Sequence, residues 1–376
     1  MAKKILIVRW AGSAYDSLGG LMELAAQELA RLGLDVVVLA GDDEDWPQRM
    51  LALLQSGEIG FALTMSGIAA EATIDGKLVW EAAQVPLFNW CCDHPCYFPD
   101  RHVIRSPYLL HGYVFPDHAR YNIAHLKANG AAYAVHLGIP PRSIFAGAPL
   151  LGPARNGRVM FAKTGKDTNG IEARWRGSDP ELSHIVFAAA EELMHRPTGD
   201  FLPVLQRIAE ARGLFLAGNS MIALTLIGEL DAYIRYRRAE MVVRSVLDQP
   251  VDVFGTGWEH IPWDAAQARY HGPLTWREML GKLPAYSGCL SINPLVDESV
   301  HDRVFFALAA GVPPLSDSNA FSRANMPGLE RYAFGFTADA IRQAVAAALA
   351  DPAQAMARTE EAWSALSGPF GLRRSA

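Results

Sequence analysis

The sequence has no long apolar run, little cysteine and no excess of positive charge. None of its hydrophobic stretches reaches the roughly 18 residues of a membrane-spanning helix, and the apolar run at residues 5–8 is too short for a secretory signal. The formal net charge is −6, which argues against a non-specific nucleic-acid binder because such proteins carry a basic surface. These absences predict a cytoplasmic protein without a transmembrane segment and without a nucleic-acid partner.

The four cysteines do not form a spaced framework. Cys91, Cys92 and Cys96 crowd together, and Cys289 is far away in the sequence. With His94 the cluster invites a zinc interpretation, but structural zinc usually takes two well-separated ligand pairs. Adjacent cysteines on a strand also point their side chains in opposite directions. We therefore expect buried thiols, no metal and no cofactor.

What the sequence does contain is a repeated alternation of strands and helices. At 376 residues, two domains are expected, and alternating elements predict parallel sheets in an α/β fold. Strands are expected at 4–10, 35–39, 60–65, 85–90, 111–115, 131–137, 158–162, 251–254, 289–293 and 312–316. Helices are expected at 21–32, 46–54, 180–194, 202–211, 222–247, 276–283, 304–310 and 338–349, with one more at the end.

A stretch rich in Gly, Pro and Ala near residues 138–157 predicts the linker between the domains. We expect a Rossmann-like domain at 1–150 and a second one at 151–350, with a final helix in 351–376 that crosses back to the first domain. In doubly wound sheets ligands bind beyond the carboxyl ends of the strands. The loops that follow strands should therefore line a central cleft.

The most informative loop follows the strand at 289–293. It runs from Asn293 to a helix that begins near His301, Asp302 and Arg303. The N–H groups at a helix start favour a diphosphate, and an arginine there adds a charge-assisted hydrogen bond. The alternative is a core helix that ends at Gly311.

A second small-residue loop follows the strand at 158–162. Backbone N–H groups of Thr164 and Gly165 are predicted to approach an anion, and Lys163 to add a positive charge, with Lys166 as the alternate. The loop lacks the glycine spacing of a Walker A motif. The alternative is a solvated turn.

These loops resemble the C-terminal domain of GT-B glycosyltransferases, most closely the group related to the spore maturation protein CgeB. The resemblance rests on the Asn-containing strand with RVFFALAAG at 303–311, GTGW at 255–258, YHGPL at 270–274 and, more weakly, WCCDHP at 90–95. It implies a GT-B fold and a metal-independent transfer of sugar from a nucleotide-diphosphate donor to a glycan, protein or other surface component. Trp258 and Tyr270 are predicted to flank the nucleobase, although both are also ordinary core aromatics.

One position departs from the pattern of that group. The glutamate that relatives carry five positions before the final glycine, where it holds the donor ribose, is Phe306 here. A related pattern has two glutamates separated by seven residues. Glu298 lies where the first of these glutamates would fall, but Phe306 stands in place of the second.

The acceptor side is expected in the first loop, residues 11–20, whose single carboxylate is Asp16. An inverting transfer needs a general base near the acceptor hydroxyl, so Asp16 is the predicted base, and a helix cap is the alternative. Asp93 and His94 follow another strand and compete for the role. Two other functions remain open: a nucleotide-sugar epimerase of the same architecture, and a non-catalytic sugar-nucleotide-binding protein.

Overall fold

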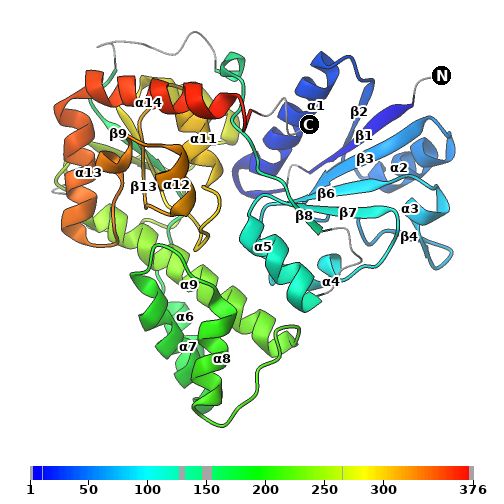
Figure 1. The fold of residues 1–376 in the computed structure, drawn as a ribbon, viewed down its shortest axis with the longest axis horizontal. Helices are drawn as coiled ribbons and strands as arrows, with labels where there is room; N and C mark the ends of the chain where they lie inside the picture. The colour runs from blue at the N-terminus through cyan, green and yellow to red at the C-terminus, as the bar shows by residue number, and fades with distance from the viewer. Residues whose placement is uncertain (1–2, 11, 127–131, 146–154, 265, 372–376) are drawn as a thin grey trace. The chain divides into compact units, whose positions relative to one another are not determined.

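The structure is a computed structural model that describes residues 3–10, 12–126, 132–145, 155–264 and 266–371. The chain divides into two compact units after Leu137. Each unit has its own parallel sheet, and Figure 1 labels the strands of the first sheet and the strands β9 and β13 of the second. No helix within the described residues combines the length and apolarity needed to cross a bilayer.

The first unit is built on a six-stranded sheet of order β2-β1-β3-β6-β7-β8 in which every neighbouring pair is parallel. Its strands are β1 Lys4–Arg9, β2 Val36–Ala40, β3 Ile59–Met65, β6 Leu87–Cys91, β7 Leu109–Tyr113 and β8 Ala132–Ala134. The order reverses at β1, as it does in doubly wound folds. A small antiparallel hairpin, β4 Thr73–Ile74 with β5 Lys77–Leu78, stands apart from the sheet.

The helices of the first unit are α1 Ser17–Arg31, α2 Trp46–Gln55, α3 Val79–Ala82, α4 Pro99–His102 and α5 Pro116–Tyr121. Helix α1 begins four residues before the predicted start. Tyr15 and Asp16, at φ 62° and 55°, form a left-handed turn, and the Ser13 hydroxyl accepts a hydrogen bond from the Leu18 N–H at 3.1 Å. The helix can therefore start directly after the first strand loop.

The second unit contains a five-stranded parallel sheet of order β11-β10-β9-β12-β13. Its strands are β9 Val159–Ala162, β10 Val251–Phe254, β11 Arg269–Tyr270, β12 Gly288–Ser291 and β13 Pro314–Ser316. Strands β10 and β12 are buried along their whole length, which explains their continuous apolar runs. The order reverses between β9 and β12, so ligands are expected beyond the ends of these two strands.

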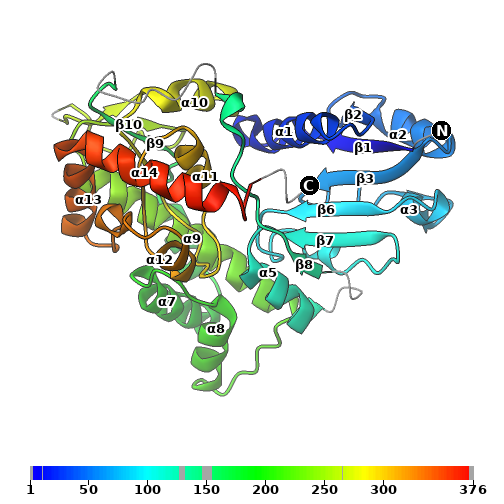
Figure 2. The same ribbon diagram turned by 45° about the horizontal axis from the view of Figure 1, so that its top comes forward.

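The connection between β9 and β10 carries four helices that gather together beside the sheet (Figures 1 and 2). They are α6 Asn169–Arg176, α7 Pro180–Met194, α8 Phe201–Glu210 and α9 Met221–Ser245. Caps define their starts: the Asp179 carboxylate accepts from the Glu181 N–H, and Pro180 occupies the first turn. Helix α9 is the longest and packs against α7, α8 and α13.

The remaining helices are α10 Trp276–Lys282, α11 Asp302–Ala309, α12 Ala320–Asn325, α13 Ala338–Ala350 and α14 Pro352–Ser367. Helix α14 packs against α11, α12 and α13 within the second unit. The guanidinium of Arg142 lies 3.6 Å from the centre of the Trp363 ring and pairs with Glu360, which ties the segment after Leu137 to α14. Residues 146–154 of the predicted linker and 372–376 of the predicted crossing segment lie outside the described residues.

Candidate functional site

The loops that follow β9 and β10 are joined backbone to backbone. The Lys163 N–H donates to the Phe254 carbonyl and the Gly165 N–H to the Thr256 carbonyl, both at 2.8 Å. A Cβ on Gly255 would lie 2.2 Å from the Lys163 carbonyl oxygen, and one on Gly257 would lie 2.1 Å from that of Gly165. Both positions therefore need glycine. Because these N–H groups are engaged, the anion cradle predicted at Lys163 to Gly165 is not formed by the backbone of Lys163 and Gly165.

Trp258 supports these loops from inside. It is fully buried, its indole N–H donates to the Lys163 carbonyl at 2.8 Å, and its ring fills the space over Gly165. The indole therefore offers no open face for a nucleobase, contrary to its predicted role. Tyr270 differs: it is only partly buried, it stacks on Trp263 at 5.5 Å between ring centres, and its hydroxyl donates to Glu259 at 3.1 Å.

The start of α11 is held in place by a chain of buried polar groups. The Asn293 side-chain oxygen accepts from the His301 N–H at 2.8 Å, and the Asn293 N–H donates to the Asp317 carboxylate at 2.8 Å. The Asn293 amide nitrogen also donates to the Asp317 carbonyl at 3.0 Å. Asn293, predicted as a donor-binding residue, thus links β12 to the end of β13 and fixes the position of the helix.

The Arg303 N–H in the first turn of α11 is already engaged by neighbouring side chains. The Asp302 carboxylate accepts from the Arg303 N–H at 2.7 Å, the His301 ring lies 3.4 Å from the same N–H, and His301 contacts Asp302 directly. Burial lowers the pKa of His301 to about 4. Burial alone would raise the pKa of Asp302, but His301 and Arg303 lower it below its usual value. A diphosphate would therefore meet the Arg303 side chain and the Asp302 carboxylate rather than an uncapped helix end.

Lys163 lies among charges of both signs, two arginines and two aspartates. Burial, and then the nearby charges of Arg303 and Arg235, lower its pKa to about 7, while Asp231 and Asp302 oppose that shift. Lys166, the alternate, is different: it is exposed, and its ammonium lies 5.5 Å from the Tyr236 ring. Of the two lysines, Lys163 is the one next to Arg303, as predicted.

Helix α9 contributes charges that the sequence did not reveal. Arg235 pairs with the buried Asp231 at 2.8 Å, and both charges lie near Lys163. Arg238 is fully buried. Its guanidinium donates to carbonyl oxygens at the end of α7, which compensates for its loss of contact with water; these belong to Leu193, Met194 and Arg196. The Asp231 and Arg235 spacing of four residues was the available signal, since such pairs lie on one helix face.

Phe306 is part of the core. It is fully buried, and its ring packs edge-on against Trp276 of α10 at 5.6 Å. A carboxylate could not replace this ring without placing an unpaired charge in the core, which is strongly unfavourable. The ribose contact expected of the related group is therefore absent at this position. Glu298 is exposed in the loop before α11.

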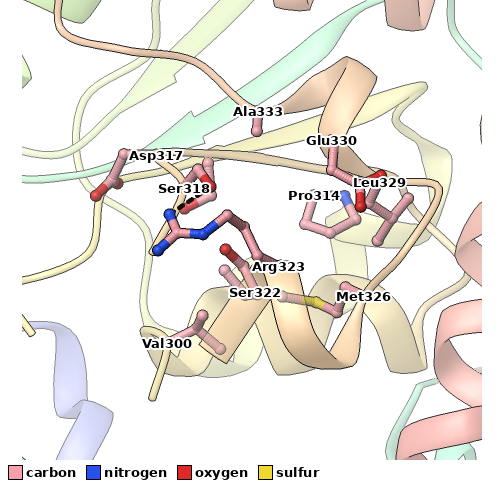
Figure 3. A pocket seen from close by; sticks show the side chains of 12 residues that line it. Val300, Pro314, Asp317, Ser318, Ser322, Arg323, Met326, Leu329, Glu330 and Ala333 are labelled. Carbon is pink, nitrogen blue, oxygen red and sulfur yellow. Dashed lines mark hydrogen bonds between the residues drawn. The ribbon is translucent and has the colours of Figure 1, made fainter. Parts of the chain in front are cut away.

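A cavity of about 30 Å³ lies beyond the end of β13, between α12 and the following turn (Figure 3). Asp317 stands at its edge, and Arg323 donates to the Ser318 hydroxyl at 3.4 Å. One Asp317 oxygen accepts from Asn293, and the other is buried with no hydrogen-bond partner among the described residues. Burial raises the pKa of Asp317 to about 6. The cavity has room for water but not for a nucleotide.

In the first unit, Asp16 lies directly beyond β1, as predicted. It occupies the N-cap position of α1, but its carboxylate does not bind the helix N–H groups. Instead it accepts from Arg9 at 2.8 Å, and Arg9 also pairs with Glu23 at 2.9 Å. The other Asp16 oxygen is buried with no hydrogen-bond partner among the described residues. Gly19 leaves room for it, because a Cβ there would lie 2.1 Å away.

The other two predicted bases follow β6. Asp93 is half-buried directly beyond the strand. His94 is buried: its ring accepts from the Cys96 N–H at 3.1 Å and packs edge-on against His118 and Tyr121. Nδ1 of His94 is therefore engaged inside the unit, and of these two residues Asp93 is the more accessible.

The sequence contains a single Asp-x-Asp spacing, at Asp43 and Asp45, in the loop between β2 and α2. Both carboxylates pair with Arg49, at 2.7 and 3.6 Å. This pair lies in the first unit, whereas Lys163 and Arg303 lie in the second. It is accounted for by exposed ion pairs between this loop and Arg49 of α2.

Three solved structures are similar to this chain over nearly its whole length. A glycosyltransferase from Rickettsia africae matches 100% of this chain and 96% of its own, at 11% identity and a TM-score of 0.50. A sucrose-phosphate synthase from Thermosynechococcus elongatus matches 99% of this chain and 96% of its own, at 12% identity and a TM-score of 0.51. An α-glucosyltransferase in complex with UDP matches 97% of this chain and 96% of its own, at 10% identity and a TM-score of 0.51.

No protein-family model matches the chain, and no curated protein matches it. At identities this low, the likeness to solved structures shows the fold and not the activity. The chain is therefore an α/β protein of the GT-B type, with two Rossmann-like units.

Proposed function

We propose that this chain is a glycosyltransferase that takes a sugar from a nucleoside-diphosphate donor. The observation that carries the proposal is the cation cluster beyond β9. Lys163 is held near Arg235 and Arg303, and the nearby Asp231 and Asp302 do not prevent its pKa from falling to about 7. Three cations share this place with two carboxylates, so a further anion would be attracted to it. A donor diphosphate supplies such a charge.

In this proposal the second unit binds the leaving group. Arg303, Lys163 and Arg235 stabilise the negative charge that develops on the diphosphate as the glycosidic bond breaks. Cationic side chains take the place that a divalent metal has in other transferases, so the reaction is metal-independent. The Tyr270 and Trp263 pair offers an aromatic surface toward which the nucleobase can lie.

The first unit supplies the acceptor side. Asp16, or Asp93 in its place, removes the proton from the acceptor hydroxyl as the new glycosidic bond forms. The Asp16 oxygen that lacks a partner supports this role, whereas the ion pair with Arg9 opposes it. The acceptor is a glycan, a protein or another surface component, as the resemblance to the CgeB-related group implies.

Calorimetry with nucleoside diphosphates tests the donor site. UDP is the first ligand to try, because a solved structure of similar fold holds it. Lys163→Met should weaken binding about 10- to 150-fold, which corresponds to the roughly 1.5–3 kcal/mol of a hydrogen bond to a charged group. Lys166→Met, in the same loop, is the matched control and should bind like the unaltered chain. Equal affinity in all three proteins would remove Lys163 from the site.

A non-catalytic sugar-nucleotide binder is the second candidate, favoured by the buried Phe306 in place of the ribose-binding glutamate. The two functions separate in one assay with a nucleotide sugar. A transferase releases nucleoside diphosphate slowly even without acceptor, because water replaces the acceptor. A binder holds the nucleotide sugar intact. An epimerase would instead return a changed sugar that is still attached to its nucleotide.

A further inference from the structure

The interior of the first unit contains an unusual set of polar side chains between β6, β7 and α4. Asn89 pairs with His111 and Cys91 with Tyr113 across the two strands. Because alternate residues of a strand share a face, these four side chains lie together. His102, the last residue of α4, joins them through a 2.6 Å contact with the Tyr113 hydroxyl. Cys91, His102 and His111 are 1%, 3% and 2% exposed.

Their hydrogen bonds leave one ring nitrogen unused. The Asn89 side-chain oxygen accepts from the Gly67 N–H at 2.6 Å, which turns the Asn89 amide nitrogen toward Nδ1 of His111 at 3.2 Å. The opposite nitrogen, Nε2 of His111, is buried and has no hydrogen-bond partner among the described residues. A buried polar atom without a partner is unfavourable, so something beyond these side chains is expected at this place.

The chemistry of these side chains suits a metal ligand set. Neutral imidazole and thiolate are the forms that bind metals, so the two histidines can serve directly and the Cys91 thiol must give up its proton.

We propose that Cys91, His102 and His111 bind one divalent transition-metal ion of the zinc class. Among the described residues, these three offer one ligand atom each, all within 4.8 Å of one another. One thiolate sulfur with two imidazole nitrogens is a set that zinc accepts readily. Binding forms one metal–sulfur and two metal–nitrogen bonds, and the Cys91 proton leaves to solvent.

Binding requires the ligand atoms, which lie within 4.8 Å of one another, to move closer together. Zinc bonds of about 2.3 Å to sulfur and about 2.1 Å to nitrogen place tetrahedral ligand atoms about 3.6 Å apart. Sγ of Cys91 lies 4.0 Å from Nδ1 of His111, so this pair closes by a few tenths of an ångström. Coordination through Nδ1 replaces the hydrogen bond from Asn89, whereas coordination through Nε2 uses the nitrogen that lacks a partner. Around His102, the Tyr113 hydroxyl and Asn122 form the outer layer that orients a metal-binding imidazole.

This site differs from the cysteine cluster that the sequence brings to notice. In the cluster at residues 91–96, Nδ1 of His94 already accepts from the Cys96 N–H. His102 and His111 come instead from another helix and another strand. The proposal is independent of glycosyl transfer, because its ligands are all in the first unit and the cation cluster is in the second.

The test uses the full chain, stripped with a chelator and then titrated with Zn²⁺ alone. We expect one zinc per chain by elemental analysis and a higher Tm on zinc addition. Co²⁺ in place of Zn²⁺ should give the near-ultraviolet band of a cobalt–thiolate bond. His111→Gln and Cys91→Ser should lose at least tenfold in zinc affinity, whereas Cys96→Ser should bind zinc like the unaltered chain.

Several outcomes would overturn the assignment. If the unaltered stripped chain shows neither bound zinc nor the cobalt band, no such site exists, and this result does not depend on whether any variant folds. Loss of zinc in Cys96→Ser together with retention in His111→Gln would move the metal to the cluster at 91–96. Zinc bound equally by all variants would place it elsewhere.

Discussion

Lys163 and Asp16 occupy equivalent places, each in the loop directly beyond the first strand of its unit, yet their surroundings are opposite. Asp16 has a partner of opposite charge, Arg9, at 2.8 Å. Lys163 has two cations, Arg303 and Arg235, and two carboxylates, Asp231 and Asp302, nearby, and burial together with the cations lowers its pKa to about 7. Asp16 therefore has a counter-ion without ligand, whereas the two carboxylates do not offset what burial and the two arginines cost Lys163, so a bound anion would favour its charged form. This difference is the reason for proposing the donor site in the second unit.

The largest expected effect concerns Asp16. Asp16→Asn keeps the size of the side chain but removes the basic carboxylate, so kcat should fall about 10²- to 10⁴-fold if this residue is the general base. Binding of nucleoside diphosphate should stay unchanged, because its ligands are in the other unit. Steady-state turnover with a nucleotide sugar and calorimetry on the same preparation measure both quantities.

Asp93→Asn is the matched variant in the competing loop. Full turnover in Asp16→Asn with loss in Asp93→Asn would move the base to the loop after β6. Full turnover in both would exclude an aspartate base from these two loops, and a retaining mechanism would then become the better interpretation. In that case Asp16 serves only to hold Arg9. The contrast would then be between a structural ion pair at Asp16 and a ligand-binding role for Lys163.

The next effect concerns the cation cluster. Arg303→Ala removes the side chain that lies beside Lys163 and the start of α11, so nucleoside diphosphate affinity should fall by about 1.5–3 kcal/mol. Arg323→Ala is the control within the same unit, because the Arg323 guanidinium donates to the Ser318 hydroxyl at 3.4 Å, beside the small cavity beyond β13. Isothermal calorimetry on both variants measures the difference. Unchanged affinity in a folded Arg303→Ala protein would contradict the donor site.

Much of the fold followed from the sequence. The α7 and β10 boundaries, Pro180–Met194 and Val251–Phe254, agree with the prediction residue for residue, because a proline after a capping aspartate and a buried apolar run are strong local signals. The short helices α3, α4, α5 and α12 were missed. They are four to six residues long, too short for the apolar spacing that identifies a helix.

The candidate site was harder to predict, because its members meet only in three dimensions. The positions of Lys163 and Asn293 just after strands and of Arg303 in the first turn of the helix that follows could be predicted, since these places lie at the carboxyl edge of the sheet, whereas their binding roles stay predictions. Trp258 was wrongly expected to face a ligand, since nothing local distinguishes an aromatic core residue from a stacking one. Arg235 and Asp231 were missed because they reach Lys163 from a helix more than sixty residues along the chain.

The pH dependence of donor binding comes next. Lys163 has a pKa of about 7 in the free chain, and a bound diphosphate should return it toward its ordinary value of about 10.4. The charges around it are Arg303 and Asp302 from α11 and Arg235 and Asp231 from α9, with His301 neutral above pH 4. The bound form therefore holds the extra proton, so affinity is full below pH 7 and falls by up to about tenfold per unit above it.

Calorimetry between pH 6.5 and 9, in buffers of different ionisation enthalpy, should reveal this proton uptake. Lys163→Arg keeps a positive charge that does not titrate in this range, so its affinity should be nearly constant across the same pH values. A flat profile for the unaltered chain, or the same slope in Lys163→Arg, would show that another group titrates. Lys163 would then not be the group whose charged form a bound diphosphate favours, and its contrast with the paired Asp16 would be lost.

The smallest effect should come from removing divalent cations, because Lys163, Arg303 and Arg235 already stabilise the diphosphate. Turnover measured in EDTA should equal turnover in Mg²⁺ or Mn²⁺ within error. If EDTA abolished activity and Mg²⁺ or Mn²⁺ restored it, the leaving group would depend on a metal and the cation cluster would not be sufficient.

Restoration of activity by Zn²⁺ alone would have a different meaning. It would point to Cys91, His102 and His111 in the first unit, where a buried ion stabilises the fold rather than the diphosphate. Brief and prolonged EDTA exposure separate these cases, since a buried ion leaves slowly and a diphosphate-bound one leaves at once.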